Sequence, residues 1–294
     1  MALGYEGYVK LGSIYALGTG TAVPRSRILI TSGGAYGQNV IGVNTIGIGA
    51  PRVYDWNTYD GSISFEITKD IFLAAKNAVL NRSTNLAIQF STRKDNLQSF
   101  TDAYWNSISI SASEGSLLDG SIGFVAMDRA SYAYGFQGIQ GYYDNKAGAG
   151  LLCPLAAGMP APLNSLNTNY NPIPSWYSKI TLGSDVYDFL SWTLDFSQEV
   201  VKFFGCTNTA GPQAPLYMGV GPMTVTLSGA FMWLDPTMPA AFPADNIATA
   251  KVDVSDVSMS FAKLELNTSS DDVQAPDSTV PVNVEYSIYE LSAS

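Results

Sequence analysis

The sequence has no histidine among its 294 residues, and this absence excludes several kinds of catalytic and metal site. Without imidazole there is no Ser-His-Asp or Cys-His nucleophile and no histidine-ligated zinc. Two cysteines, Cys153 and Cys206, are too few for a four-thiolate site. Phosphate loops of the GKS or GKT kind are also missing, which leaves little support for nucleotide binding. We therefore expect a protein that is not an enzyme and that holds no cofactor and no metal.

Charged residues are scarce as well, at 14% against roughly 25% in average soluble domains. Residues 1–147 hold 11 basic and 11 acidic residues, whereas residues 148–294 hold 4 and 14, so the net charge of −10 arises in the second half. Stable binding of nucleic acid by phosphate neutralisation needs clustered Lys and Arg, and we do not expect it here. A surface with so few charges is better suited to assembly with other chains.

No apolar run approaches the roughly 20 residues that a membrane helix needs. The most apolar stretch, around Cys153, is interrupted by Pro154, Pro160 and Pro162. The N-terminal residues lack the basic and apolar regions of a secretion signal. We expect a protein made in a cytoplasm, with no membrane partner. Its cysteines are expected as free thiols, although a disulfide between Cys153 and Cys206 stays open.

The chain does have a hydrophobic content of 46% and a dominant sequence period of two residues. Apolar and polar residues alternate in four segments, a pattern typical of strands with one buried face. These segments are residues 62–68, 107–113, 190–197 and 223–228. Later strands are expected at 252–266 and 280–291. The predicted fold class is mainly β.

The remaining segments predict a short helix and long loops. A helix is expected at about 69–81, where apolar residues recur on one face. Segments 30–50 and 130–175 are rich in Gly, Ala, Asn, Pro and Tyr, which favours long loops or extended arms. The stretch 271–279 is expected to be an exposed connection before a final strand.

The change in charge suggests a division into two halves. Residues 1–147 form an N-terminal β-rich half with the helix, and residues 148–294 form an acidic C-terminal β-rich half. Each half contains a strand, an intervening segment and a second strand region, although the two share little identity. The halves are either one intertwined domain or a structural duplication.

The four alternating segments share a polar face with an unusual composition. Thirteen of its fifteen residues are Ser or Thr, two are acidic and none is basic. Sheets that face open water usually carry Lys, which also discourages pairing at strand edges. One interpretation is a plain solvated surface; the other is the lining of a narrow space beside a negatively charged partner. The residues are Ser62, Ser64, Glu66, Thr68, Ser107, Ser109, Ser111, Ser113, Ser191, Thr193, Asp195, Ser197, Thr224, Thr226 and Ser228.

Carboxylates are the remaining groups that could support chemistry. Paired acids can hydrolyse glycosides, and clustered acids can bind calcium, but solvated surface acids are the simpler interpretation of every group here. The candidates are Asp185 with Asp188, Asp195 with Glu199, Asp253 with Asp256, and Asp271 and Asp272 with Asp277.

Several segments resemble the tail tube proteins, or major tail proteins, of tailed bacteriophages. Residues 5–17 (YEGYVKLGSIYAL) and 23–27 (VPRSR) are similar to the start of such proteins. Residues 190–197 (LSWTLDFS) and 219–233 (GVGPMTVTLSGAFMW) are similar to their paired tube strands. The resemblance is one of pattern over about two thirds of the chain, and none of these segments is unique to the family.

The resemblance implies a β-sandwich or open-barrel subunit whose sheets join those of its neighbours into a ring. The expected rings are hexamers, and they stack into a hollow tube through which the phage genome passes during ejection. A duplicated chain would instead form trimers with pseudo-sixfold symmetry. The implied partners are further copies of the chain, other tail proteins, and duplex DNA that passes without stable binding, and the implied location is the virion tail, assembled in the host cytoplasm.

Two other functions remain open from the sequence. The first is another virion structural protein, such as a decoration or head-tail connector subunit. The second is a β-rich carbohydrate-binding adhesin, suggested by 17 Tyr and 5 Trp, although aromatic residues more often fill cores and interfaces.

Overall fold

The computed structural model describes strands, a helix and their short connections from both halves of the chain. Cys153 and Cys206 lie outside the described residues, as do most of the expected loop segments 30–50 and 130–175 and nearly all of the connection at 271–279. The described residues are 8–11, 14–22, 25–31, 42–44, 52–91, 97–126, 130–132, 171–187, 189–203, 217–232, 244–271 and 281–292.

Strands dominate the described residues, which confirms the prediction of a mainly β protein with one short α-helix. The elements in chain order are β1 (Tyr8–Leu11), β2 (Ile14–Ala22), β3 (Arg25–Thr31), β4 (Gly42–Asn44), β5 (Arg52–Glu66), α1 (Lys69–Leu80), β6 (Leu86–Ser91), β7 (Leu97–Ser113), β8 (Asp119–Ala126), β9 (Ala130–Tyr132), the 3₁₀-helix η3 (Ser175–Tyr177), β10 (Ser178–Leu182), β11 (Asp185–Tyr187), β12 (Phe189–Phe203), β13 (Tyr217–Met232), β14 (Asn246–Val254), β15 (Val257–Asp271) and β16 (Pro281–Ser292).

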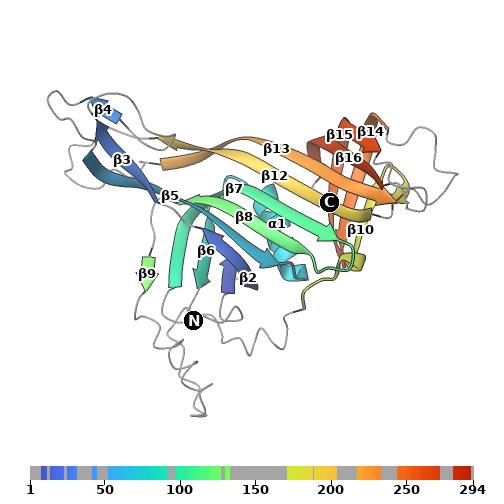
Figure 1. Cartoon of the computed structure of the whole chain (residues 1–294), viewed down its shortest axis with the longest axis horizontal. Helices are drawn as coiled ribbons and strands as arrows, with labels where there is room; N and C mark the ends of the chain where they lie inside the picture. The colour runs from blue at the N-terminus through green and yellow to red at the C-terminus, as the bar shows by residue number, and fades with distance from the viewer. Residues whose placement is uncertain are drawn as a thin grey trace, which may run out of the picture.

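The strands form one sheet of 16 strands that curls into a half-barrel (Figure 1). Its main path runs β11-β10-β14-β15-β16-β13-β12-β7-β6-β1-β2-β5-β3-β4, and β8 pairs with both β5 and β7. Neighbouring strands are antiparallel except β3 and β4. The pairings β1-β2-β5-β8-β7-β6 also return to β1 and make a closed circuit. β7 therefore belongs both to this circuit and, through β12, to the open part of the sheet.

The central strands β5, β8, β7, β12 and β13 bury one face of the sheet. Ile63, Ile122, Ile108, Phe196 and Val225 lie opposite one another across these five strands, and all are buried. Each buried side chain of this size stabilises the fold by about 1.5–3 kcal/mol. The alternation seen in the sequence therefore arises because every second residue contributes to one continuous core.

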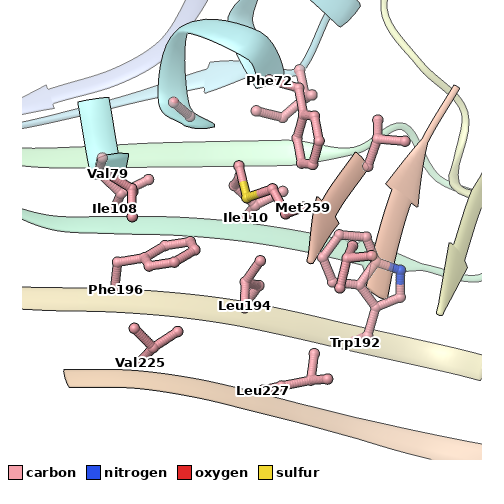
Figure 2. Close-up of a cluster of buried hydrophobic side chains, with 14 of the residues drawn as sticks. Phe72, Val79, Ile108, Ile110, Trp192, Leu194, Phe196, Val225, Leu227 and Met259 are labelled. Atoms are coloured by element: carbon pink, nitrogen blue, oxygen red, sulfur yellow. The ribbon is translucent and has the colours of Figure 1, made fainter. Parts of the chain in front are cut away.

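Helix α1 covers this buried face, and Figure 2 shows its residues Phe72 and Val79 beside core side chains of β7. The prediction of a helix at 69–81 is confirmed. The placement of Thr68 on the polar face was wrong, because β5 ends at Glu66 and Thr68 is the N-cap of α1. Its hydroxyl oxygen accepts a hydrogen bond from the backbone N–H of Ile71 at 3.3 Å, which satisfies one free donor of the first turn.

Two buried hydrogen bonds join the helix to the sheet. The indole Nε1 of Trp105 on β7 donates to the carbonyl oxygen of Ala78 on α1 at 3.0 Å. The carbonyl oxygen of Trp105 accepts from Nε2 of Gln198 on β12 at 2.8 Å. Trp105 and Gln198 are both buried, so these bonds fix the positions of α1, β7 and β12 relative to one another.

The single strand expected at 252–266 is in fact the end of β14, a turn and most of β15. The turn consists of Ser255 and Asp256, and Ser255 has a φ of 57°, the left-handed conformation that two-residue hairpin turns require. The amino group of Lys76 on α1 donates to the carbonyl oxygen of Ser258 at 2.8 Å, so this hairpin is also tied to the helix. The strand expected at 280–291 corresponds to β16.

Substitutions at the neighbouring residues Leu194 and Thr193 of β12 test which face of the sheet is buried. Leu194 is 0% exposed in the core, whereas Thr193 lies on the opposite, polar side of the strand. Leu194→Ala should lower the free energy of unfolding by about 2–5 kcal/mol, because it leaves a cavity in the core. Thr193→Val keeps the branched shape and should change it by less than about 0.5 kcal/mol. Urea denaturation measures both, and similar losses in the two variants would contradict the assigned faces.

Tyr286 on β16 gives a prediction for alkaline pH. Its side chain is 0% exposed, its hydroxyl has no hydrogen-bond partner among the described residues, and burial, with Tyr187 and Asp245 nearby, raises its pKa to about 12. Unfolded tyrosine titrates near 10. Between these values the unfolded chain loses a proton that the folded chain keeps, so stability that is complete below pH 10 declines as the pH rises.

Tyr286→Phe should therefore remove up to one proton per molecule from the pH dependence of unfolding between pH 10 and 12, and should be neutral or slightly stabilising at pH 7. Urea denaturation at a series of pH values measures the slope. An unchanged alkaline slope would show that the Tyr286 hydroxyl ionises normally in the folded protein.

Candidate functional site: a polar sheet face

The side of the central strands opposite the core is lined by polar residues in aligned rows. Because residues opposite each other in a register share a face, each row crosses several strands on one side of the sheet. We call the four rows together the polar face. The longest two rows cross seven strands, from β5 to β15. The first is Ser64, Ser121, Ser109, Asp195, Thr226, Ser287 and Glu265; the second is Glu66, Asp119, Ser111, Thr193, Ser228, Glu285 and Thr268.

Two shorter rows flank these. One contains Ser62, Gly123, Ser107, Ser197 and Thr224, and the other contains Ser113, Ser191, Ala230 and Asn283. The structure therefore brings 14 of the 15 residues predicted for a shared face onto one side of one sheet, and Thr68 is the exception. Whether these residues line a lumen stays a prediction.

Short side chains on the polar face satisfy one another across the strands. The hydroxyl oxygens of Ser197 and Thr224 lie 2.6 Å apart. At the other side of the face, the Ser287 hydroxyl donates to Oδ1 of Asn267 at 3.0 Å, and Nδ2 of Asn267 donates to Glu285 at 3.1 Å. These bonds pair polar atoms of the face with one another across neighbouring strands.

The charges on the polar face are all negative. Its four rows contain Glu66, Asp119, Asp195, Glu265 and Glu285, and no Lys or Arg. Glu66 and Asp119 are directly opposite each other on β5 and β8, so two carboxylates of the face are cross-strand neighbours. The face is therefore negatively charged over strands from both halves of the chain.

Lys202 lies near the C-terminal end of β12, close to the polar face, and it forms an ion pair with Asp60. The Lys202 amino group donates to Thr58 Oγ1 at 2.8 Å and to Asp60 Oδ1 at 3.2 Å, and the two charged side chains are 14% and 25% exposed. The contact ties β12 to β5. Lys202 therefore acts as a link between strands more than as a site for anions.

A shallow hollow of about 350 Å³ opens on the polar face. Small-molecule sites are usually lined mainly by apolar and aromatic side chains, whereas this hollow is lined by Ser, Asp and Gly residues and does not resemble such a site. Its lining consists of Ser64, Ser109, Ser111, Asp119, Gly120 and Ser121.

The candidate acid pairs do not gather into a site among the described residues. Asp256 forms an ion pair with Lys69 on α1, which lowers the pKa of this carboxyl through its hydrogen bond to the lysine. Asp253 accepts from the Ser258 hydroxyl and pairs with Lys251 at 2.8 Å. These acids hold the β14–β15 hairpin in place.

The other candidate acids are further apart or not described. Asp195 lies on the polar face of β12, and Glu199 follows on the same strand. Asp188, Asp272 and Asp277 lie outside the described residues. No group of three acidic or cysteine side chains in the described stretches is arranged to hold a metal ion.

Sequence reasoning missed the contributions of β8 and β16 to the polar face. On β16 the signal was present, because Asn283, Glu285 and Ser287 alternate with buried Val284 and Tyr286. On β8 it was weak, because glycines occupy both faces and alternation is hard to see. The strands could be predicted, but their place in the sheet could not.

Neither family models nor curated proteins provide a relative of this chain: no protein-family model matches it, and no curated protein matches it. Among the described residues no helix is both long and apolar enough to cross a membrane.

Proposed function

We propose that this chain is a virion structural protein that forms the hollow tail tube of a bacteriophage. The observation that carries the proposal is the polar face: seven antiparallel strands present hydroxyl-bearing and acidic side chains in register on one side of a curled sheet, with no basic residue in the rows. In this proposal the polar face lines the lumen.

The composition of the face suits a wall past which DNA slides. Duplex DNA carries one negative charge per about 1.7 Å of its axis, so inward lysines would bind it along the whole path. Serine and threonine offer no ionic contact to phosphate, and the carboxylates of Glu66, Asp119, Asp195, Glu265 and Glu285 repel it. A plain solvated face would tolerate lysine and would ordinarily contain it.

The open margins of the sheet support assembly. Strands β11 and β4 stand at the two ends of the main sheet path, and each is described as pairing on one side. Unpaired edges promote association, and in a ring they would be satisfied by the neighbouring copy. We propose hexameric rings that stack in the tail, with a trimer as the alternative if the two halves are a duplication.

Assembly of the purified protein tests the proposal. Concentrated protein viewed by negative-stain electron microscopy should form hollow polymers of constant bore. Discs or closed particles would favour a decoration or connector subunit, and a monodisperse monomer that binds glycans would favour an adhesin.

The direction of the polar face within the polymer is tested by thiol labelling. Ser107→Cys lies on the polar face and Asn77→Cys lies on the exposed side of α1, each in a chain with Cys153→Ser and Cys206→Ser. A maleimide attached to a large protein should label both sites in the monomer, but in the polymer it should label position 77 alone. Equal labelling of position 107 in the polymer would place the polar face on the exterior.

Lysines introduced into the row that contains Ser62 and Ser107 test whether a face without basic residues is needed for DNA to pass. Thr226 is unsuitable because it lies opposite Asp195, which would neutralise a lysine there, whereas Ser62 and Ser107 are exposed and their row contains no acid. A phage carrying Ser62→Lys with Ser107→Lys should assemble tails but eject DNA more slowly, by at least about tenfold if each ring adds phosphate contacts.

The matched control is Ser62→Gln with Ser107→Gln, which adds similar length without charge. Ejection rates are measured by dye release from purified virions at several salt concentrations. The lysine defect should weaken as salt rises, whereas a purely steric defect would be shared by the glutamine control.

A further inference from the structure

Two exposed apolar groups lie at opposite ends of β12. At one end, Phe203 on β12 and Tyr217 on β13 stack with ring centroids 4.3 Å apart and an interplanar angle of 16°. They are 41% and 56% exposed. We call these two residues the aromatic pair.

The aromatic pair lies on a projecting part of the β12–β13 hairpin. The described pairing of β7 with β12 covers residues 191–197, and that of β16 with β13 covers residues 225–232. Beyond them the two strands continue as a ribbon, which reaches toward β3 and β5 in Figure 1. Two contacts attach this ribbon to the rest of the protein. Nη1 of Arg82 donates to the carbonyl oxygen of Gly221 on the ribbon at 3.0 Å, and Lys202 on the ribbon donates to Thr58 on β5. The fold therefore supports the ribbon and still leaves its aromatic pair in water.

At the other end of β12, a hollow of about 340 Å³ opens beside the edge strand β11. Trp176 and Val186 at this hollow are 70% and 51% exposed, although both are large apolar side chains. We call it the edge hollow. Its lining includes Trp176, Lys179, Val186, Tyr187, Phe189 and Trp192.

The two groups cannot meet within one molecule. They are separated by the 15 residues of β12, which span about 50 Å at roughly 3.3 Å per residue. One is a projecting pair of aromatic rings, and the other is a hollow that combines apolar side chains such as Trp176 with polar ones such as Glu114. A stacked pair in which one ring carries a hydroxyl offers both kinds of contact to such a hollow. A second copy of the chain is the partner that brings both to every contact.

We propose that the aromatic pair of one copy inserts into the edge hollow of the next. This deepens the proposed function, on which it rests, by naming a contact through which copies join. Because the two surfaces differ, the contact is head-to-tail, and it generates a ring if the rotation between copies closes and a filament if it does not. Aromatic residues bury about 150–250 Å² each, enough to anchor an interface that other contacts complete.

Variants at each surface test the contact. The pair variant is Phe203→Thr with Tyr217→Thr, which keeps residues that favour strands. The hollow variant is Trp176→Ser with Val186→Thr. The matched control is Leu80→Gln, which removes a 40% exposed leucine from α1, an element that contributes to neither surface.

Each double variant should raise the concentration needed for self-association at least about tenfold, and the control should not. A mixture of the two double variants retains one intact pair and one intact hollow. It should therefore form a complex of twice the 31.4 kDa chain mass, measured by sedimentation velocity, and no larger species. Melting temperatures of the separate variants show whether each one folds.

Crosslinking gives a second measurement that leaves the contact residues in place. Gly219 lies beside the ring of Phe203, and the exposed Lys179 lines the edge hollow. In a chain with Cys153→Ser and Cys206→Ser, Gly219→Cys with Lys179→Cys should give a ladder of oligomers with a short bismaleimide, and each single cysteine should give none. Dimers from Gly219→Cys alone would mean that the aromatic pair contacts itself, and the absence of any ladder would equally overturn the proposal.

The outcomes separate this inference from the proposed function. Tubes that persist in both double variants would retain the function and overturn the contact. Oligomers that are not hollow but disappear in both variants would retain the contact and overturn the function. A wild-type chain that stays monomeric at every concentration would overturn both.

Discussion

The register of the central strands is the constraint on which the rest of the structure depends. Because side chains alternate across a strand, a slip of one residue would exchange the core and the polar face. Ile108, Phe196 and Val225 on the buried side are held opposite one another by the same pairings that align Ser109, Asp195 and Thr226 on the other side. The chemistry of the polar face is thus fixed by the packing of the core.

Much of this could be predicted from the sequence because the period of two is a local signal. The strands around residues 63, 108, 194 and 226, the helix from Lys69 and the shared polar face follow from alternation and amphipathicity. The residues at which strands end and the helix begins were harder to predict. A strand and an N-cap both place a residue in extended conformation, so Thr68 could not be separated from the end of β5 by pattern.

The order of strands could not be predicted, because it depends on contacts between distant residues. Nothing local indicates that β12 follows β7, that β16 borders β13, or that β1 closes a circuit with β6. The turn at Ser255 was missed although the sequence contains its signal: the consecutive polar residues Ser255 and Asp256 shift the phase of the alternation by one residue. The aromatic pair was missed for a similar reason, since Phe203 and Tyr217 become neighbours through pairing of separate segments.

Strand β7 has a mechanical consequence through its place in both parts of the sheet. Seven residue pairs join it to β12, from Ser113 opposite Ser191 to Ser107 opposite Ser197. Antiparallel hydrogen bonds run perpendicular to the strands, so tension along β12 loads this ladder in shear and its bonds share the force. Peeling would break them one after another. A pull transmitted along the hairpin thus meets the sheet in its most resistant direction, and the closed circuit behind β7 spreads the load.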